Sequence, residues 1–196
     1  MGVCGENRNQ NKMINKTKND IIFSGHKQIP VNISNKVMKS ICKIKVNDEE
    51  GESYGTGFFL NFTNSLKCLI TNYHIIYQIL ENENIIIEIH NKKIMRLKFN
   101  NRYTKYVKKP KDITMIEIKE SDNIYNDIEF LDYNNNYIDR GYIIYDNIDI
   151  FSIEHPYGDD ALCASGKIIK INEYEFEHDI STDDGSSGCP IILFTL

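Results

Sequence analysis

From Lys39 onward the chain alternates between short apolar runs and polar breaks, and few of the runs reach the length of a helix. Isoleucine is frequent in these runs, and β-branched side chains suit the pleated surface of a sheet. Strand-sized runs with regular turn residues between them predict an all-β fold, an antiparallel sandwich or barrel. The expected strands are Ser40–Val46, Gly55–Asn61, Cys68–Thr71, Asn84–His90, Ile94–Phe99, Thr114–Ile118, Tyr142–Ile144, Ile148–Ile153, Leu162–Ile171, Tyr174–Ile180 and Pro190–Leu196.

The same pattern divides the chain into segments. Residues 1–37 are polar with little periodicity, which predicts a flexible tail. Residues 38–122 and 140–196 hold the expected strands, and the acidic, Asn-rich stretch 123–139 reads as a connection between these two halves. One short helical turn is expected after His74, and its apolar face would consist of Ile75, Ile76, Ile79 and Leu80.

Composition narrows the class of protein. The 196 residues carry a net charge of −5, which argues against nucleic acid as the main partner. A mean hydropathy of −0.43 and the lack of a long apolar run exclude a bundle of membrane helices. The five cysteines form no CxxC pair, so we expect no zinc site. Nothing else in the sequence calls for a metal or an organic cofactor, and we expect neither.

The first thirty residues contain no apolar core of a secretory signal, so we expect an intracellular protein with reduced thiols. Gly2 could accept myristate and Cys4 palmitate, which would give the two signals that stable membrane anchoring needs. The myristoylation pattern requires Ser or Thr at position 6, where this chain has Glu6. We therefore do not expect a membrane anchor, and the oligomeric state stays open.

Three short stretches carry candidate chemistry. They are Thr71–His74 (TNYH), Asp112–Thr114 (DIT) and Gly185–Pro190 (GSSGCP), with Gly55–Phe58 (GTGF) upstream of all three. A serine hydroxyl becomes a strong nucleophile when an imidazole takes its proton, and that imidazole needs a carboxylate to fix its tautomer. A serine turn flanked by glycines can also present backbone N–H groups to a developing oxyanion.

In this order and spacing the motifs resemble those of trypsin-like (chymotrypsin-fold) serine peptidases, most closely the bacterial and glutamyl-endopeptidase-like members. The GSSGCP stretch is similar to the family's Gly-x-Ser-Gly-x-Pro box, and TNYH to its Thr-Ala-x-His box, with Asn72 in place of Ala. The resemblance covers roughly residues 38–196. It implies two antiparallel β-barrels, the first over residues 38–122 and a partial second one over residues 140–196.

The resemblance also implies roles for individual residues. Ser187 would be the nucleophile, His74 the general base and acid, and Asp112 the carboxylate that orients the histidine. The N–H groups of Gly185 and Ser187 would form the oxyanion hole. Ser181 and Thr182 would line the primary specificity pocket, where the Ser181 position holds Asp in trypsin, so cleavage after Lys or Arg is not supported. The expected partner is a polypeptide substrate.

Several alternatives compete with these assignments. Ser186 is a rival nucleophile, although the Gly-x-Ser-Gly frame favours Ser187. Cys189 lies two residues past the nucleophile position and reads as a small core residue. The segment Lys105–Lys111 reads most simply as a solvated loop. Other candidate residues for the site are the carboxylates Asp122, Asp127 and Asp132 and the pair His178–Asp179, whose side chains would point to opposite faces of a strand.

Two functions follow from the resemblance. The first is a serine endopeptidase that works through an acyl-enzyme. The second is a catalytically inactive or truncated relative that binds peptides, because only nine residues follow Ser187 and the family's second barrel needs further strands. The sequence favours the first and leaves the second open.

Overall fold

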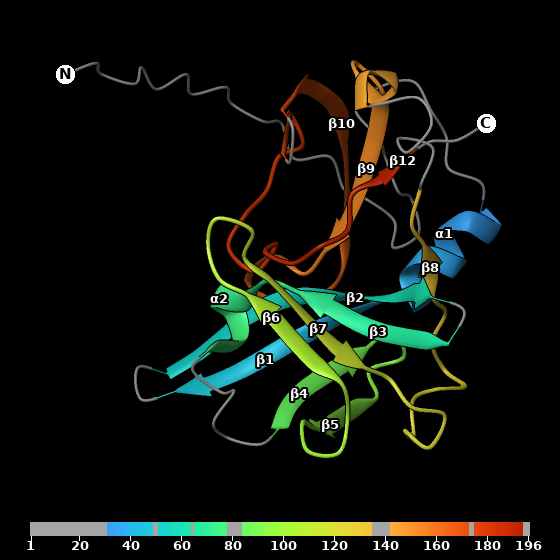
Figure 1. The fold of residues 1–196 in the computed structure, drawn as a ribbon, viewed down its shortest axis with the longest axis vertical. Helices are drawn as coiled ribbons and strands as arrows, with labels where there is room; N and C mark the ends of the chain where they lie inside the picture. Colours follow the sequence, from blue (N-terminus) through green and yellow to red (C-terminus); the bar gives the residue numbers. More distant parts are fainter. Residues whose placement is uncertain are drawn as a thin grey trace, which may run out of the picture.

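The computed structural model describes residues 31–48, 51–63, 65–77, 84–134, 142–172 and 175–193. These residues form two β-sheets that lie one above the other in Figure 1. The larger sheet belongs to the first half of the chain and the smaller one to the second half. Gly2, Cys4, Ile79 and Leu80, which entered the sequence predictions, lie outside the described residues.

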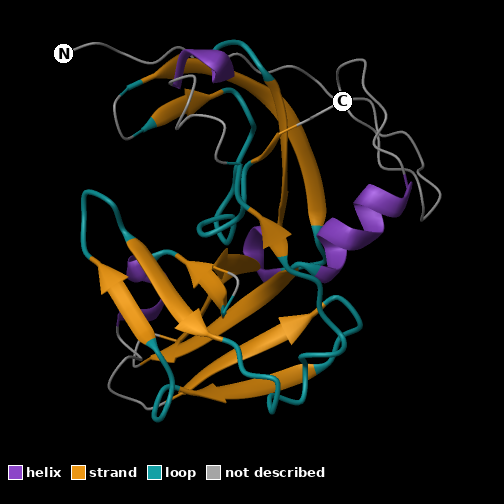
Figure 2. Ribbon diagram, turned by 45° about the vertical axis from the view of Figure 1, so that its right-hand side comes forward, coloured by secondary structure: helices purple, strands orange, loops and turns teal. Residues whose placement is uncertain are grey.

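The larger sheet has eight strands, and seven of them follow the order β5-β4-β1-β2-β3-β7-β6 with antiparallel neighbours. Figure 2 shows this sheet curled around its own interior. The eighth strand, β8, pairs in parallel with β2. The strands are β1 (Ile41–Asp48), β2 (Gly51–Thr63), β3 (Leu66–Thr71), β4 (Asn84–Ile89), β5 (Ile94–Lys98), β6 (Thr104–Val107), β7 (Ile113–Glu117) and β8 (Leu131–Asp132).

Alternating side chains explain the core of this sheet. In β4 the buried residues are Ile85, Ile87 and Ile89, every second position, so one face of the strand enters the interior. Phe59 and Leu69 from β2 and β3 meet them there, both fully buried. Burial of about ten such aliphatic and aromatic side chains supplies the main stabilisation of the sheet.

The smaller sheet has four strands in the order β11-β10-β9-β12. Ile150, Ile168 and Ile180 form its buried cluster. A further apolar cluster joins the two sheets, because Ile41 of β1 and Phe151 of β9 pack together with Val37 of helix α1 (Val31–Lys39). The strands are β9 (Asp149–Glu154), β10 (Leu162–Ile171), β11 (Phe176–His178) and β12 (Ile192–Leu193).

Most expected strands are present, and the differences have local causes. The prediction of a strand at Tyr142–Ile144 is wrong, because Tyr142–Tyr145 forms a short 3-10 helix, η2. The strands β6 and β8 and the helix α1 were not expected, and α1 lies partly in the segment predicted as a tail. At the end of α1, the Ser40 hydroxyl donates a hydrogen bond of 2.8 Å to the Lys36 carbonyl, which satisfies one free acceptor of the last turn.

Candidate active site

His74 lies in α2 (Tyr73–Ile76), a single helical turn that follows β3 directly. Ile75 and Ile76 are buried and fix this turn against the first sheet, whereas 45% of the His74 side chain is exposed. Gly55 of β2 makes room for the turn, since a Cβ at this position would lie 2.5 Å from the Ile75 Cδ1. The apolar residues after His74 therefore anchor the helix and leave the imidazole at the surface.

Asp112 lies just before β7 and adopts the left-handed conformation, with φ of 52°. Its Oδ2 lies 2.5 Å from the His74 Nδ1, and its Oδ1 accepts a hydrogen bond of 2.9 Å from the His74 backbone N–H. The Asp112 carbonyl accepts two more hydrogen bonds, from the Tyr73 N–H at 3.2 Å and from the Asn72 Nδ2 at 2.7 Å. Asp112 thus fixes both the imidazole and the start of α2.

The electrostatics agree with an ionised Asp112. Partial burial raises the pKa of this carboxyl, but the hydrogen bonds from the His74 side chain and backbone outweigh burial and hold the pKa below its ordinary value. An anionic carboxylate accepts a hydrogen bond from the His74 Nδ1–H. In that tautomer the Nε2 keeps its lone pair and can accept a proton.

Ser187 lies in a turn of residues 183–189, which we call the serine turn. Its two glycines have left-handed φ values, 93° at Gly185 and 87° at Gly188. Inside the turn, the Ser186 N–H donates to the Asp183 carbonyl at 3.0 Å and the Cys189 N–H donates to the Ser186 carbonyl at 3.1 Å. These bonds hold Ser187 at the exposed tip of the turn.

Thr56 of β2 connects the serine turn to the first sheet. Its N–H donates to the Ser187 carbonyl at 2.8 Å, and its hydroxyl donates to the Gly185 carbonyl at 2.9 Å. The serine turn also packs tightly against β2 and β3 at Gly188. A Cβ added at this position would lie 2.2 Å from the Thr56 carbonyl oxygen and 2.5 Å from the Thr71 Oγ1. Thr71 ends β3, three residues before His74, so the serine turn lies against the strand that leads to His74.

The remaining predicted site residues are placed as follows. Ser181 and Thr182 are exposed and lie in the segment between β11 and the serine turn. Within the described part of the chain, no hydrogen bond joins the Ser187 hydroxyl to His74, and the N–H groups of Gly185 and Ser187 donate to no other protein group. The structure therefore brings His74 and Asp112 into contact and presents Ser187 on a turn whose Gly188 lies against Thr71 and Asn72, just before His74 in the chain.

The rival carboxylates have other partners. Asp122 forms a bidentate ion pair with Arg102, at 2.9 and 3.0 Å, and both side chains are largely buried. Asp127 pairs with Lys93, and Asp132 accepts a hydrogen bond from Asn61. These partners explain the three carboxylates as structural groups.

Sequence reasoning missed Glu154, which lies at the end of β9 and is only 3% exposed. Its carboxyl group forms a side-chain hydrogen bond with Ser186, and the Cys189 Sγ lies 3.9 Å from its Oε2. Burial and the nearby charge of Asp183 raise the pKa of Glu154. The signal in the sequence was an acidic residue directly after the expected strand Ile148–Ile153.

No group of three His, Cys, Asp or Glu side chains that could hold a metal ion occurs among the described residues. No helix in the described ranges is long and apolar enough to cross a membrane.

No protein-family model matches the chain, and no curated protein matches it by sequence. Solved structures do match its fold. A serine endoprotease from Yersinia pestis is similar with a TM-score of 0.60 and 16% identity, over 85% of this chain and 55% of that one. Deg5 is similar with a TM-score of 0.57 and 16% identity, over 83% of this chain and 78% of that one. The HtrA-type protease AlgW with tripeptide is similar with a TM-score of 0.59 and 13% identity, over 83% of this chain and 50% of that one.

The chain thus spans about half the length of two of these three structures. The neighbours are HtrA and Deg proteases, so they support the trypsin-like fold but not the glutamyl-endopeptidase side of the resemblance. Together with the two sheets described above, they show that the chain has the two-barrel fold of the chymotrypsin-like serine proteases, with an incomplete second barrel.

Proposed function

We propose that the chain is a serine endopeptidase in which Ser187 is the nucleophile, His74 the general base and acid, and Asp112 the orienting carboxylate. One observation carries the proposal. Asp112 accepts hydrogen bonds from both the imidazole and the backbone N–H of His74, on a protease fold whose serine turn lies against β3. That arrangement fixes the histidine tautomer needed to activate a serine.

In the proposed reaction the Ser187 Oγ attacks the carbonyl carbon of a peptide bond, and its proton moves to the His74 Nε2. The N–H groups of Gly185 and Ser187 stabilise the oxyanion of the tetrahedral intermediate. His74 then gives its proton to the leaving amine, the C–N bond breaks and an acyl-enzyme remains. Water, deprotonated by His74, hydrolyses the ester and restores Ser187.

We also propose that Ser181 and Thr182 contact the substrate residue before the scissile bond. Their exposed position on the segment that leads into the serine turn supports this role. A polypeptide substrate agrees with the neighbours, one of which is a protease solved with a tripeptide.

Hydrolysis of unfolded casein by the purified chain tests the proposed function. We expect new peptides with the unchanged protein and a loss of at least about a thousandfold in rate with Ser187→Ala, as removal of a nucleophile produces. Ser121→Ala changes an exposed serine that follows β7, at the opposite end of that strand from Asp112, and is the matched control, expected to keep full activity. A folded, inactive protein that still binds casein would instead support a peptide-binding module.

A further inference from the structure

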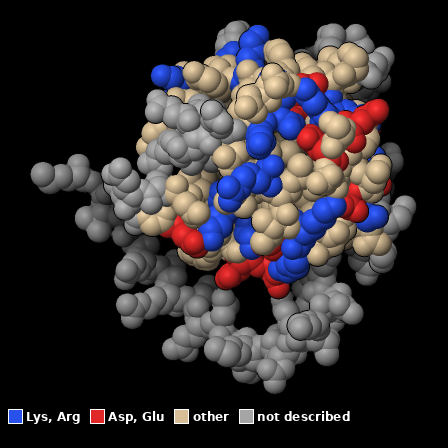
Figure 3. All heavy atoms as spheres, turned by 90° about the horizontal axis from the view of Figure 1, so that it is seen from below, with Lys and Arg blue, Asp and Glu red and all other residues tan. Residues whose placement is uncertain are grey.

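The charge of the chain is strongly segregated. Residues 91–111 contain nine Lys or Arg and no Asp or Glu, although the whole chain has a net charge of −5. Figure 3 shows Lys and Arg side chains gathered in a band across the face of the first sheet that is seen from below. The segment responsible comprises β5, the loop that follows it, β6 and the loop that ends at Asp112.

Some of these cations are neutralised inside the protein and others are not. Lys92 pairs with Asp160, Lys93 with Asp127, and Arg102 with Asp122. The unneutralised group forms no ion pair within the described residues, and all five of its side chains are exposed. We call it the basic strip, and it consists of Arg96, Lys98, Lys105, Lys108 and Lys109.

The basic strip leads to the candidate active site. β6 runs beside β7 from the β5 side of the barrel towards α2 (Figure 1), and Lys108 and Lys109 follow it in the chain. The Asp112 N–H donates to the Lys108 carbonyl at 3.4 Å, and the Lys108 Nζ lies 5.9 Å from the centre of the Tyr73 ring. Tyr73 directly precedes His74, so one end of the strip reaches the residue next to the imidazole.

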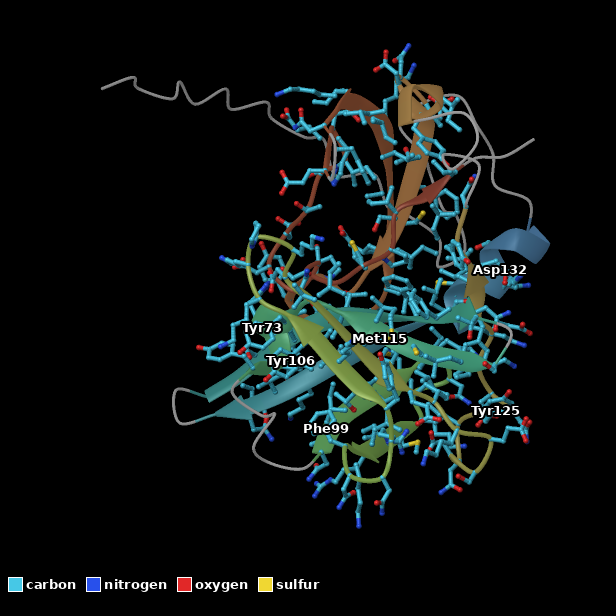
Figure 4. All side chains as sticks on the ribbon, in the orientation of Figure 1. Tyr73, Phe99, Tyr106, Met115, Tyr125 and Asp132 are labelled. Atoms are coloured by element: carbon cyan, nitrogen blue, oxygen red, sulfur yellow. The ribbon has the colours of Figure 1, made fainter. Side chains whose placement is uncertain are left out.

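Aromatic side chains extend the surface at that end. The Tyr73 and Tyr106 rings are stacked with their centres 5.1 Å apart, and Figure 4 shows the two labelled residues together. Tyr106 is 49% exposed, as is its neighbour Val107. A chain passing over the Tyr73–Tyr106 stack would therefore meet aromatic surface beside the Lys108 ammonium group, a combination that suits an acidic polypeptide with interspersed apolar residues.

We propose that the basic strip binds an acidic segment of a polypeptide substrate and guides the adjoining bond to His74 and Ser187. The guidance of the bond to His74 and Ser187 rests on the proposed function, whereas the binding of an acidic segment does not. A cluster of exposed like charges raises the local concentration of an oppositely charged chain and speeds its association. A long uniform polyanion fits less well, because the remainder of the molecule carries a net charge of −14 and would repel it.

Binding is measured by fluorescence anisotropy with the full chain carrying Ser187→Ala, so that cleavage cannot consume the probe. The probes are fluorescein-labelled (Glu-Ala)5 and the uncharged (Gln-Ala)5. Lys105→Gln/Lys108→Gln removes two charges of the strip, and Lys36→Gln/Lys39→Gln removes two exposed charges of α1 as the matched control. Thermal unfolding of each variant verifies that it is folded.

We expect (Glu-Ala)5 to bind more tightly than (Gln-Ala)5 and to lose affinity as NaCl rises from 50 to 200 mM. The strip variant should bind (Glu-Ala)5 roughly five- to twentyfold more weakly, whereas the α1 variant should stay within about twofold of the parent. Equal affinity for the two peptides, or equal losses in the two variants, would overturn the proposal.

Two further arms separate competing outcomes. Binding to phosphatidylserine vesicles or to a poly(U) oligomer without binding to (Glu-Ala)5 would assign the strip to a different partner and overturn the inference. If a fluorophosphonate labels Ser187 in a protein that does not bind (Glu-Ala)5, the proposed function is supported and the inference about the basic strip is wrong. Binding of (Glu-Ala)5 without labelling of Ser187 would support the binding role of the basic strip and count against the proposed function.

Discussion

Asp112 is the residue on which the geometry of the site depends most. Its left-handed φ of 52° turns the chain so that the carboxylate meets the His74 imidazole while the carbonyl meets Tyr73 and Asn72. A non-glycine residue in this region costs about 1–3 kcal/mol, which the four hydrogen bonds offset. Backbone strain of this kind is common where a side chain must be aimed.

Glu154 gives a prediction at the residue scale, in the form of a pH dependence. Because the pKa of Glu154 is raised by folding, the folded protein holds this proton more tightly than the unfolded chain does. Its contribution to stability is therefore complete below the ordinary glutamate pKa of about 4.3 and is lost as pH rises through the folded value. Glu154→Gln removes this titration and keeps the shape of the side chain.

Urea unfolding at pH 5 and pH 8 measures this effect. Relative to the unchanged protein, Glu154→Gln should be more stable at pH 8 than at pH 5, since the glutamine never has to be buried as an anion. Burial raises the pKa of the neighbouring Cys189 thiol above its ordinary value, so this thiol stays largely protonated at both pH values and adds little to the change between them. The same difference at both pH values would contradict the assignment.

Sequence reasoning proposed Ser187, His74 and Asp112 because short motifs mark each of them, and the structure brings two of these residues, His74 and Asp112, into contact. It could not find Glu154, whose importance comes from a contact with Ser186, thirty-two positions away. It also could not find the role of Thr56, whose hydroxyl donates a hydrogen bond to the carbonyl of Gly185 in the serine turn, 129 positions further along the chain. Such contacts depend on how two sheets meet, which no local pattern records.

At the scale of elements, the apolar pattern predicted most strands because alternation is strong where one face of a strand is buried. It missed β6 because three of its four residues are exposed, and the run Thr104–Val107 contains little that marks a buried face. It placed a strand at Tyr142–Ile144 because a short apolar run fits a strand and a 3-10 turn equally well. Local sequence patterns are least able to distinguish a strand from a turn in short apolar runs without alternation.

The serine turn allows a test at this scale. Gly188→Ala should destabilise the protein by about 2–4 kcal/mol, because the new Cβ would meet the Thr56 carbonyl and the Thr71 hydroxyl as well as strain a φ of 87°. Gly51→Ala is the matched control, since Gly51 also has a positive φ, 137°, but nothing lies within 4 Å of the new Cβ. Its cost should be about 1–2 kcal/mol, that of strain alone.

Chemical denaturation measures both variants, and casein hydrolysis by Gly188→Ala gives the functional result. If the contact of the serine turn with β2 and β3 positions Ser187, activity should fall with Gly188→Ala even under conditions where the variant is folded. Equal stability losses at the two glycines would show that the close contact at Gly188 contributes nothing beyond backbone strain.

At the scale of the whole molecule, the candidate site lies where the two sheets meet. The first sheet supplies His74 and Asp112, the second half of the chain supplies Ser187, and Thr56 and the apolar cluster around Phe151 hold the halves together. The basic strip lies on and just after β5 and β6 of the first sheet, and its Lys108 reaches the ring of Tyr73, which precedes His74. The net charge of −5 hides this segregation, so a composition summary alone could not reveal it.

The proposed function depends most on Ser187 being a nucleophile that His74 activates. The most direct measurement is reaction of the folded chain with a fluorophosphonate, followed by mass spectrometry of the digested protein to locate the adduct. We expect one adduct, on Ser187, and a rate of labelling that falls by at least about a thousandfold in His74→Ala, because the hydroxyl then loses its base. A folded protein that gains no adduct, or whose Ser187 is labelled equally fast without His74, would contradict the proposed function.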